Sequence, residues 1–191
     1  MSGGAGLIVK LEDQDVRAAF ARMKQFPGTR MTHMLDAIGA YGENSTRLRY
    51  RTQTSPDGMP WKPSQRALKQ GGQTLVKTGR MRASVTHNVL QGNSGVEWGS
   101  NVVYYAPNQF GATIHREARE QSIFQRMGRD GTVATRFVKR KHATIERRVH
   151  VGAHDIVIPA RPSLGLSQQD RVEIVTIAER AEAAAVTGGA P

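Results

Sequence analysis

Apolar side chains recur at helical spacing in three parts of the chain. The first part follows a short apolar run at residues 7–11, typical of a strand, and has Asp13 as its expected N-cap. The second is a stripe that begins at Met31, and the third opens at Ser167, where Asp170 three residues later resembles a capping box. The positions that carry the three predicted helices are Val16, Ala19, Phe20 and Met23; Met31, Met34, Leu35, Ile38 and Tyr41; and Ile174, Ile177, Ala178 and Ala181.

Between residues 85 and 106 the pattern changes to alternation and short apolar runs. The runs "SVTHNVL", "GVEW" and "VVYYA" are separated by "QGNSG" and "GSN", and Gly and Asn are the residues that tight turns require. We therefore predict an antiparallel meander or hairpin with the helices packed on it. The expected fold class is α+β: a small antiparallel sheet flanked by N-terminal helices and a C-terminal helix.

Residues 112–150 have a different composition. They hold ten Lys or Arg against four acids, and "GRDG" at 128–131 is a natural chain reversal. The limbs "SIFQRM" and "TRFVKR" on either side contain too few apolar residues for a core of their own. We predict one domain over residues 1–191 with a long basic hairpin or arm inserted at about 112–150.

The whole chain is strongly basic, with 27 Lys and Arg, 16 Asp and Glu, a formal charge of +11 and a pI near 10.7. Such a surplus attracts polyanions or a complementary acidic protein surface, and the alternative interpretation is that it serves solubility alone. Cysteine is absent, which excludes disulfides and thiolate chemistry. No stretch approaches the length of an apolar membrane span, and no export signal opens the chain, so we expect a soluble protein without a membrane partner.

Candidate catalytic groups are few. His150 and His154 are four residues apart and could share a face, but they lack an evident third ligand. No nucleotide-binding, zinc-protease or serine-hydrolase motif occurs, and Ser163 lacks the strand and turn that a nucleophile needs. We expect no enzyme activity, no metal and no cofactor. The two tryptophans are interpreted structurally: Trp98 as core, and Trp61, between Pro60 and Pro63, as the anchor of a loop or a contact to another subunit.

Four stretches in order, "PDGMPWKP", "LVKTGRMRASV", "VEWGSNVVYYAPNQFG" and "IPARPSLGLS", resemble the phage virion morphogenesis family, the tail-completion or neck proteins of Mu-like tailed phages. The resemblance covers about residues 8–183. Departures from the family pattern are Asn108, Met81 and Ser163, where the family usually has His, Leu and Phe. The matching positions are Pro56, Asp57, Gly58, Pro60 and Trp61; Leu75, Thr78, Gly79, Arg80 and Ser84; Gly99, Ser100, Tyr105, Ala106, Gln109, Phe110 and Gly111; and Ile158, Pro159, Ala160, Arg161, Pro162, Gly165 and Ser167.

The resemblance implies a structural protein that completes or terminates the tail and joins it to the head as a ring, with six copies expected from tail-tube symmetry. Its implied partners are itself, the tail tube protein, a head–tail connector or stopper protein, and DNA in the channel. Its implied location is the virion neck, after assembly in the host cytoplasm. The alternative hypotheses are a monomeric nucleic-acid-binding protein and an enzyme acting on a polyanion. The expected subunit or partner contacts are Trp61, Lys62, Lys69, Arg80, Arg82, Arg116, Arg119, Arg126, Arg136, Lys139, Arg140 and Arg161.

Overall fold

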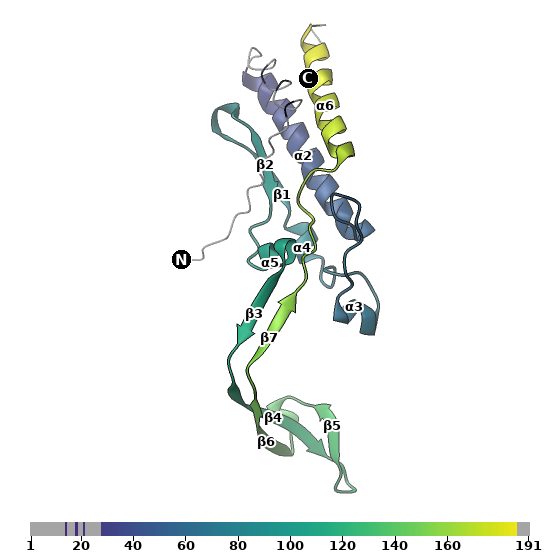
Figure 1. The fold of residues 1–191 in the computed structure, drawn as a ribbon, viewed down its shortest axis with the longest axis vertical. Helices are drawn as coiled ribbons and strands as arrows, with labels where there is room; N and C mark the ends of the chain where they lie inside the picture. Colours follow the sequence, from purple (N-terminus) through teal and green to yellow (C-terminus); the bar gives the residue numbers. More distant parts are fainter. Residues whose placement is uncertain (1–13, 15–17, 19–20, 22–27, 187–191) are drawn as a thin grey trace. The chain divides into compact units, whose positions relative to one another are not determined.

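A computed structural model describes residues 14, 18, 21 and 28–186, and the chain divides into two compact units (Figure 1). Unit 1 comprises Met1–Ala112 and Pro159–Pro191, and unit 2 comprises Thr113–Ile158. The strand predicted at 7–11 and the four apolar positions of the helix predicted after it lie outside the described residues. The helices and small antiparallel sheets confirm the α+β class.

Two long helices form the first core of unit 1. Helix α2 (Gly28–Thr52) buries the predicted stripe, in which Leu35 and Ile38 are almost fully enclosed. Helix α6 (Gln168–Val186) lies beside α2 and adds Ile174 and Ala178 to the same cluster (Figure 1). Methionines at helical spacing therefore serve as core packing.

A β-hairpin packs on α2 at two glycines, where the helix has no side chain. Strands β1 (Thr86–Val89) and β2 (Val96–Gly99) pair antiparallel around the short η1 turn (Gln91–Asn93), which confirms the predicted hairpin. A Cβ added to Gly42 would lie 2.6 Å from the Trp98 ring, and one added to Gly39 would lie 2.5 Å from the His87 ring. These glycines weaken the helix by propensity, and their lack of a side chain lets the hairpin approach it.

The third strand predicted for the meander is wrong. Val102 and Tyr105 are buried, whereas Val103 and Tyr104 between them are exposed. This spacing of three is helical, and the segment leads into helix α5 (Tyr105–Phe110) instead of a strand.

The second core of unit 1 gathers residues from short elements. Helix α3 (Gln65–Gln70) begins at the Ser64 cap, and α4 (Arg80–Ala83) follows Gly79, whose φ of 73° lies in the left-handed region that glycine tolerates. The members of this cluster are Tyr50, Trp61, Met81, Val85, Val102, Tyr105 and Leu164.

Unit 2 is made almost entirely of strands. Strand β3 (Ala112–Arg116) pairs with β7 (His154–Ile158), so the ladder that opens this unit extends past the 112–150 stretch. Strands β5 (Val133–Phe137), β4 (Arg119–Met127) and β6 (Ile145–Val151) form a sheet in that order, with the η2 turn (Arg140–His142) before β6. The predicted limbs pair as β4 and β5, but β4 makes its longer ladder with β6.

Candidate functional site

Unit 1 contains a site in which many hydrogen bonds converge on the extended segment at residues 162–165, and we call this site the clamp. Three side chains from separate elements donate to the segment's four consecutive backbone carbonyls. Trp61 Nε1 donates to the first (2.9 Å), Arg49 Nη1 to the second and fourth (2.6 and 2.9 Å), and Gln109 Nε2 to the third (2.8 Å). Buried carbonyls need such partners when no strand runs beside them.

Gln109 binds both the N–H groups and a carbonyl of this segment. Its Oε1 accepts hydrogen bonds from the backbone N–H groups of Ser163 and Leu164, at 2.9 and 3.0 Å. Together with the bond from Nε2, one carboxamide makes three hydrogen bonds to the segment. The side chain is buried in α5, so the helix that replaces the predicted strand is what positions it.

A buried ion pair closes the clamp. Arg49 Nη2 donates to Asp170 Oδ2, and both side chains are less than one-tenth exposed. Ser45 Oγ donates to the other carboxylate oxygen at 2.5 Å, and Ser167 donates to Oδ2 through its N–H and its hydroxyl, both at 2.7 Å. The Asp170 N–H in turn donates to Ser167 Oγ at 3.1 Å, which confirms the predicted capping box.

Burial alone would raise the pKa of Asp170, but the hydrogen bonds from Ser45 and Ser167 and the charge of Arg49 outweigh it and lower that pKa. Burial lowers the pKa of Arg49, and the neighbouring carboxylate opposes this change. The clamp is therefore a charged site stabilised in its ionised form.

Ser163 sits at the centre of the clamp without a base beside it. Its hydroxyl lies 2.6 Å from Tyr105 Oη and 3.3 Å from Tyr50 Oη. Burial raises the pKa of both phenols, so both remain neutral at physiological pH and neither can activate the hydroxyl. The polar side chain that departs from the family pattern here is satisfied by two tyrosines.

Two of the predicted contact residues belong to the interior of unit 1. Trp61 is 6% exposed and meets Tyr50 edge-on, with ring centroids 5.3 Å apart, which confirms its interpretation as a loop anchor. Arg161 is also 6% exposed and donates through Nε to the carbonyl of Lys62 at 2.7 Å. Burial lowers the pKa of this guanidinium.

The other predicted contact residues lie on the surface of the two units. Lys62, Lys69 and Arg80 are exposed and Arg82 is partly exposed, all in unit 1. Arg116, Arg119, Arg126, Arg136, Lys139 and Arg140 are exposed on unit 2.

Unit 2 leaves its cations available. Among the described residues, its acids make ion pairs only with histidines: Asp155 with His115 at 2.7 Å and Glu120 with His150 at 2.9 Å. All ten Lys and Arg of this unit are thus without an acidic partner in the described part of the chain. Two of them donate hydrogen bonds to neutral oxygens: Arg126 Nε to His142 O at 2.8 Å, and Arg119 Nη2 to Gln121 Oε1 at 3.2 Å.

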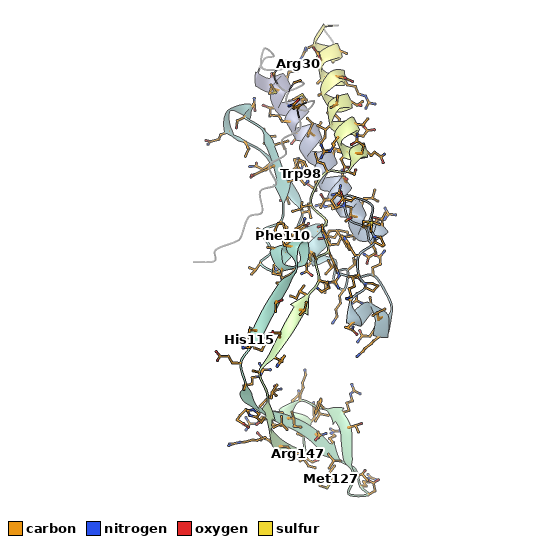
Figure 2. The ribbon with its side chains drawn as sticks, viewed as in Figure 1. Arg30, Trp98, Phe110, His115, Met127 and Arg147 are labelled. Carbon is orange, nitrogen blue, oxygen red and sulfur yellow. The ribbon has the colours of Figure 1, made fainter. Side chains whose placement is uncertain are left out.

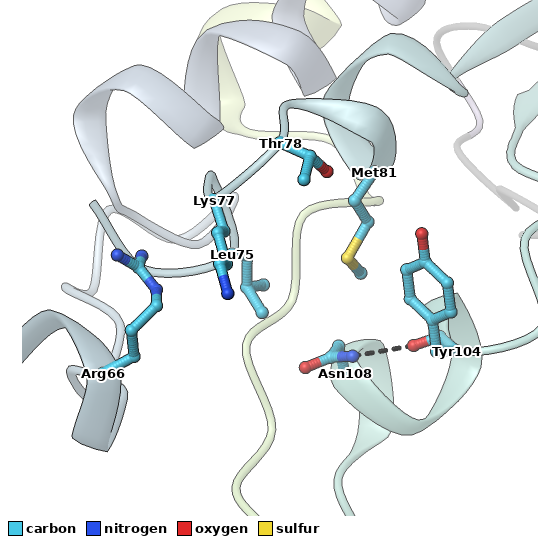
Figure 3. A pocket seen from close by; sticks show the side chains of 7 residues that line it. All are labelled: Arg66, Leu75, Lys77, Thr78, Met81, Tyr104 and Asn108. Atoms are coloured by element: carbon cyan, nitrogen blue, oxygen red, sulfur yellow. Dashed lines mark hydrogen bonds between the residues drawn. The ribbon is translucent and has the colours of Figure 1, made fainter. Parts of the chain in front are cut away.

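A shallow pocket of about 230 Å³ opens beside α4 and α5 in unit 1 (Figure 3). Its wall combines apolar side chains with two cations and holds no acid. Inside it, Asn108 Nδ2 donates to the carbonyl of Tyr104 at 2.7 Å. The lining residues are Arg66, Leu75, Lys77, Thr78, Met81, Tyr104 and Asn108.

The two candidate metal ligands do not converge on a site. His150 Nδ1 lies 2.9 Å from Glu120 Oε1, and His154 Nδ1 donates to Gly152 O at 2.9 Å. Over the described ranges, no three His, Asp or Glu side chains are arranged to hold a metal ion. Within those same ranges, no helix is long and apolar enough to cross a bilayer.

Local patterns missed the central members of the clamp. The apolar pattern gives no sign of the role of Arg49, which is buried and bonds to residues 114 to 121 positions away. In the sequence, only the family resemblance pointed to Gln109. The motif residues Trp61, Gln109 and Ser167 meet at the clamp, so the stretches that carry the resemblance specify the packing of unit 1.

The clamp stabilises the fold of unit 1, and exposed basic side chains lie on the surfaces of both units. The model of the phage virion morphogenesis family matches residues 11–181, nearly the whole chain. The chain belongs to this family, and its role is in the structure or assembly of a phage virion. Neither the curated proteins nor the solved structures contain a significant match.

Proposed function

We propose that this protein is a structural component of the neck of a tailed-phage virion, where it completes the tail and joins it to the head as a ring of subunits. Family membership supports the virion role. The observation that carries the ring is the contrast between the units: unit 1 has two packed cores, while every residue of unit 2 is described and none of them is buried. A strand-rich arm without a core gains stability when a neighbour covers it.

The exposed cations suggest how the ring meets its partners. Copies of a chain with charge +11 surround a channel with positive potential if these faces turn inward, which suits the passage or retention of a DNA end. Turned outward, they pair with acidic surfaces of a tail tube protein and of a connector or stopper protein. Closed rings use heterologous contacts, so the arm and the surface that receives it differ, and six copies would match the tail tube.

The role that we propose is structural and not catalytic. The buried polar side chains of the clamp hold residues 162–165, because their donors and acceptors are paired to backbone groups of that segment. The one hydroxyl at its centre has neutral phenols for neighbours. Such an arrangement stabilises a fold and has no free base or acid to offer a substrate.

The test removes the arm and retains its base. Residues 117–153 are replaced by a short Gly-Ser turn that joins β3 to β7, and the product is compared with the whole chain by light scattering, alone and with purified tails. Unit 1 should stay folded, which Trp61 and Trp98 report because both tryptophans belong to it. Loss of ring-sized species and of tail binding is expected. An unchanged assembly state would refute the arm's role.

The second candidate function is a monomeric nucleic-acid-binding protein, favoured by the ten unpaired cations of unit 2. It predicts tight DNA binding whose affinity falls steeply with salt. Protein stripped of nucleic acid that stays monomeric, ignores tails and binds DNA in this manner would replace the neck proposal.

A further inference from the structure

The strand register of unit 2 sorts its side chains onto two unlike faces. Residues directly opposite each other in an antiparallel ladder point to the same side of the sheet. The β4–β6 pairs Gln121↔Val149 and Gln125↔Ile145 therefore share a face with the β4–β5 pair Met127↔Val133. We call it the apolar face, and define it by Ile123 and Met127 of β4, Val133 and Phe137 of β5, and Ile145 and Val149 of β6. Polar side chains border these residues on the same face: Arg147 lies opposite Ile123, and Arg119, Gln121 and Gln125 belong to β4.

The opposite face of the sheet is polar. It carries the pairs Glu120↔His150 and Ser122↔Arg148, and Phe124 is its exception. Alternation of this kind is typical of a sheet with one side on a core and the other in water. The sequence of unit 2 thus specifies a covered side.

Unit 2 supplies no cover for that side. Phe137 is 64% exposed, Met127 51% and Val133 42%, and the remaining members of the apolar face are partly exposed (Figure 2 labels Met127). None of the residues of this fully described unit is buried. Three strands about 4.8 Å apart and about 3.3 Å per residue over seven residues give a sheet face of roughly 300 Å², which is the size of a functional patch.

We propose that a second copy of this chain covers the apolar face, with unit 1 of that copy as the receiving surface. This inference deepens the proposed ring and rests on it. Unit 1 exposes large apolar side chains, including Met59 (67%), Leu68 (65%), Val103 (69%) and Phe110 (64%). Each copy then holds both halves of a heterologous contact, as a closed ring requires.

The small size of the face agrees with a ring. A stable interface buries about 800 Å² on each partner, so one such contact between two free copies is weak. In a closed ring every copy gives one contact and receives one, which stabilises the assembly beyond a single pair. Because each copy is strongly basic, salt should strengthen this contact by screening repulsion, whereas it weakens DNA binding.

Two neighbouring positions on the central strand test the inference directly. The chain has no cysteine, so Ile123→Cys and Ser122→Cys each carry a single thiol, on the apolar and the polar face respectively. A benzophenone maleimide is attached to each, and a mixture of isotope-labelled and unlabelled protein is irradiated in concentrated solution. We expect the probe at position 123 to cross-link unit 1 of another copy, with the yield rising with salt, and the probe at position 122 not to.

Three results would overturn the inference: equal cross-linking from both positions, cross-linking only within one copy, or cross-linking only between two unit 2 sheets. The absence of any cross-link at the highest soluble concentration would also overturn it.

A matched pair of double variants on β6 adds a quantitative test. Ile145→Ser with Val149→Ser alters the apolar face, and Glu146→Ser with Arg148→Ser alters the polar face; both leave the net charge unchanged. Sedimentation should show self-association of the first weakened at least about tenfold, and that of the second within about twofold of the parent. Equal effects would contradict the assignment.

The inference and the proposed function fail separately. A protein that self-associates through the apolar face but does not complete tails contradicts the neck role alone. Normal tail completion by the Ile145→Ser, Val149→Ser variant contradicts the inference alone.

Discussion

Replacing Asp170 by Asn tests how the clamp holds unit 1 together. The change keeps the size of the side chain and removes its charge. An amide oxygen in the position of Oδ2 can still accept from Ser167, but Ser45, which donates to Oδ1, loses its acceptor. The guanidinium of Arg49, whose side chain is 8% exposed, loses its counter-ion. Removing one partner of a buried ion pair costs about 3–5 kcal/mol, because the other charge stays buried and unpaired. That is a large part of the about 5–15 kcal/mol that stabilises a domain.

The effect should depend on pH in a defined direction. The folded state lowers the pKa of Asp170, so this carboxylate contributes stability above its unfolded pKa of about 4, and loses it as pH falls through the folded value. The parent protein therefore loses its advantage over the Asn variant in acid. Near neutral pH the full difference should be present.

Urea unfolding followed by tryptophan emission measures this difference, since Trp61 and Trp98 both report unit 1. The control is Asp36→Asn in α2, where the carboxylate is 67% exposed and lies 3.2 Å from His87, so its loss should cost under about 1 kcal/mol. A loss below about 1 kcal/mol for the Asp170 variant at pH 7, or a loss equal at pH 3 and pH 7, would refute the reasoning.

Other substitutions test the packing around the clamp. Gly42→Ala should destabilise unit 1 by about 1–3 kcal/mol in thermal unfolding, because its Cβ meets the Trp98 ring; an unchanged melting temperature would contradict this contact. Gln109→Leu leaves two N–H groups and one carbonyl unpaired and should cost about 3–6 kcal/mol in urea unfolding, with a cost below 1 kcal/mol counting against the clamp. His87 has its pKa raised: burial opposes this, but the hydrogen bonds and negative charges of Glu43, at 2.7 Å, and Asp36, at 3.2 Å, together prevail. His87→Gln should therefore destabilise the protein below about pH 6.5 and lose this effect as pH rises through the folded pKa; a gap that widens with pH would disprove it.

Near-neighbour patterns in the sequence were sufficient for several elements. The stripe at Met31 predicts α2, the Ser167 and Asp170 pair predicts the start of α6, and alternation around a Gly-rich break predicts the β1–β2 hairpin. Helix periodicity, caps and tight turns depend on residues a few positions apart, so a single sequence contains the information. The order of four short motifs was enough for the family.

Contacts between distant residues were decided by the tertiary structure alone. Arg49 joins Asp170 across 121 positions, and nothing near Arg49 in the sequence distinguishes it from the exposed or partly exposed arginines of the same helix. In unit 2 the apolar residues looked too few for a core, and only the β4–β6 register places them on one face. Side-chain period fixes which residues alternate along a strand, but the partner strand determines which of them lie together. The chain by itself therefore determined its helices, its hairpin and its family, and folding determined the clamp and the apolar face.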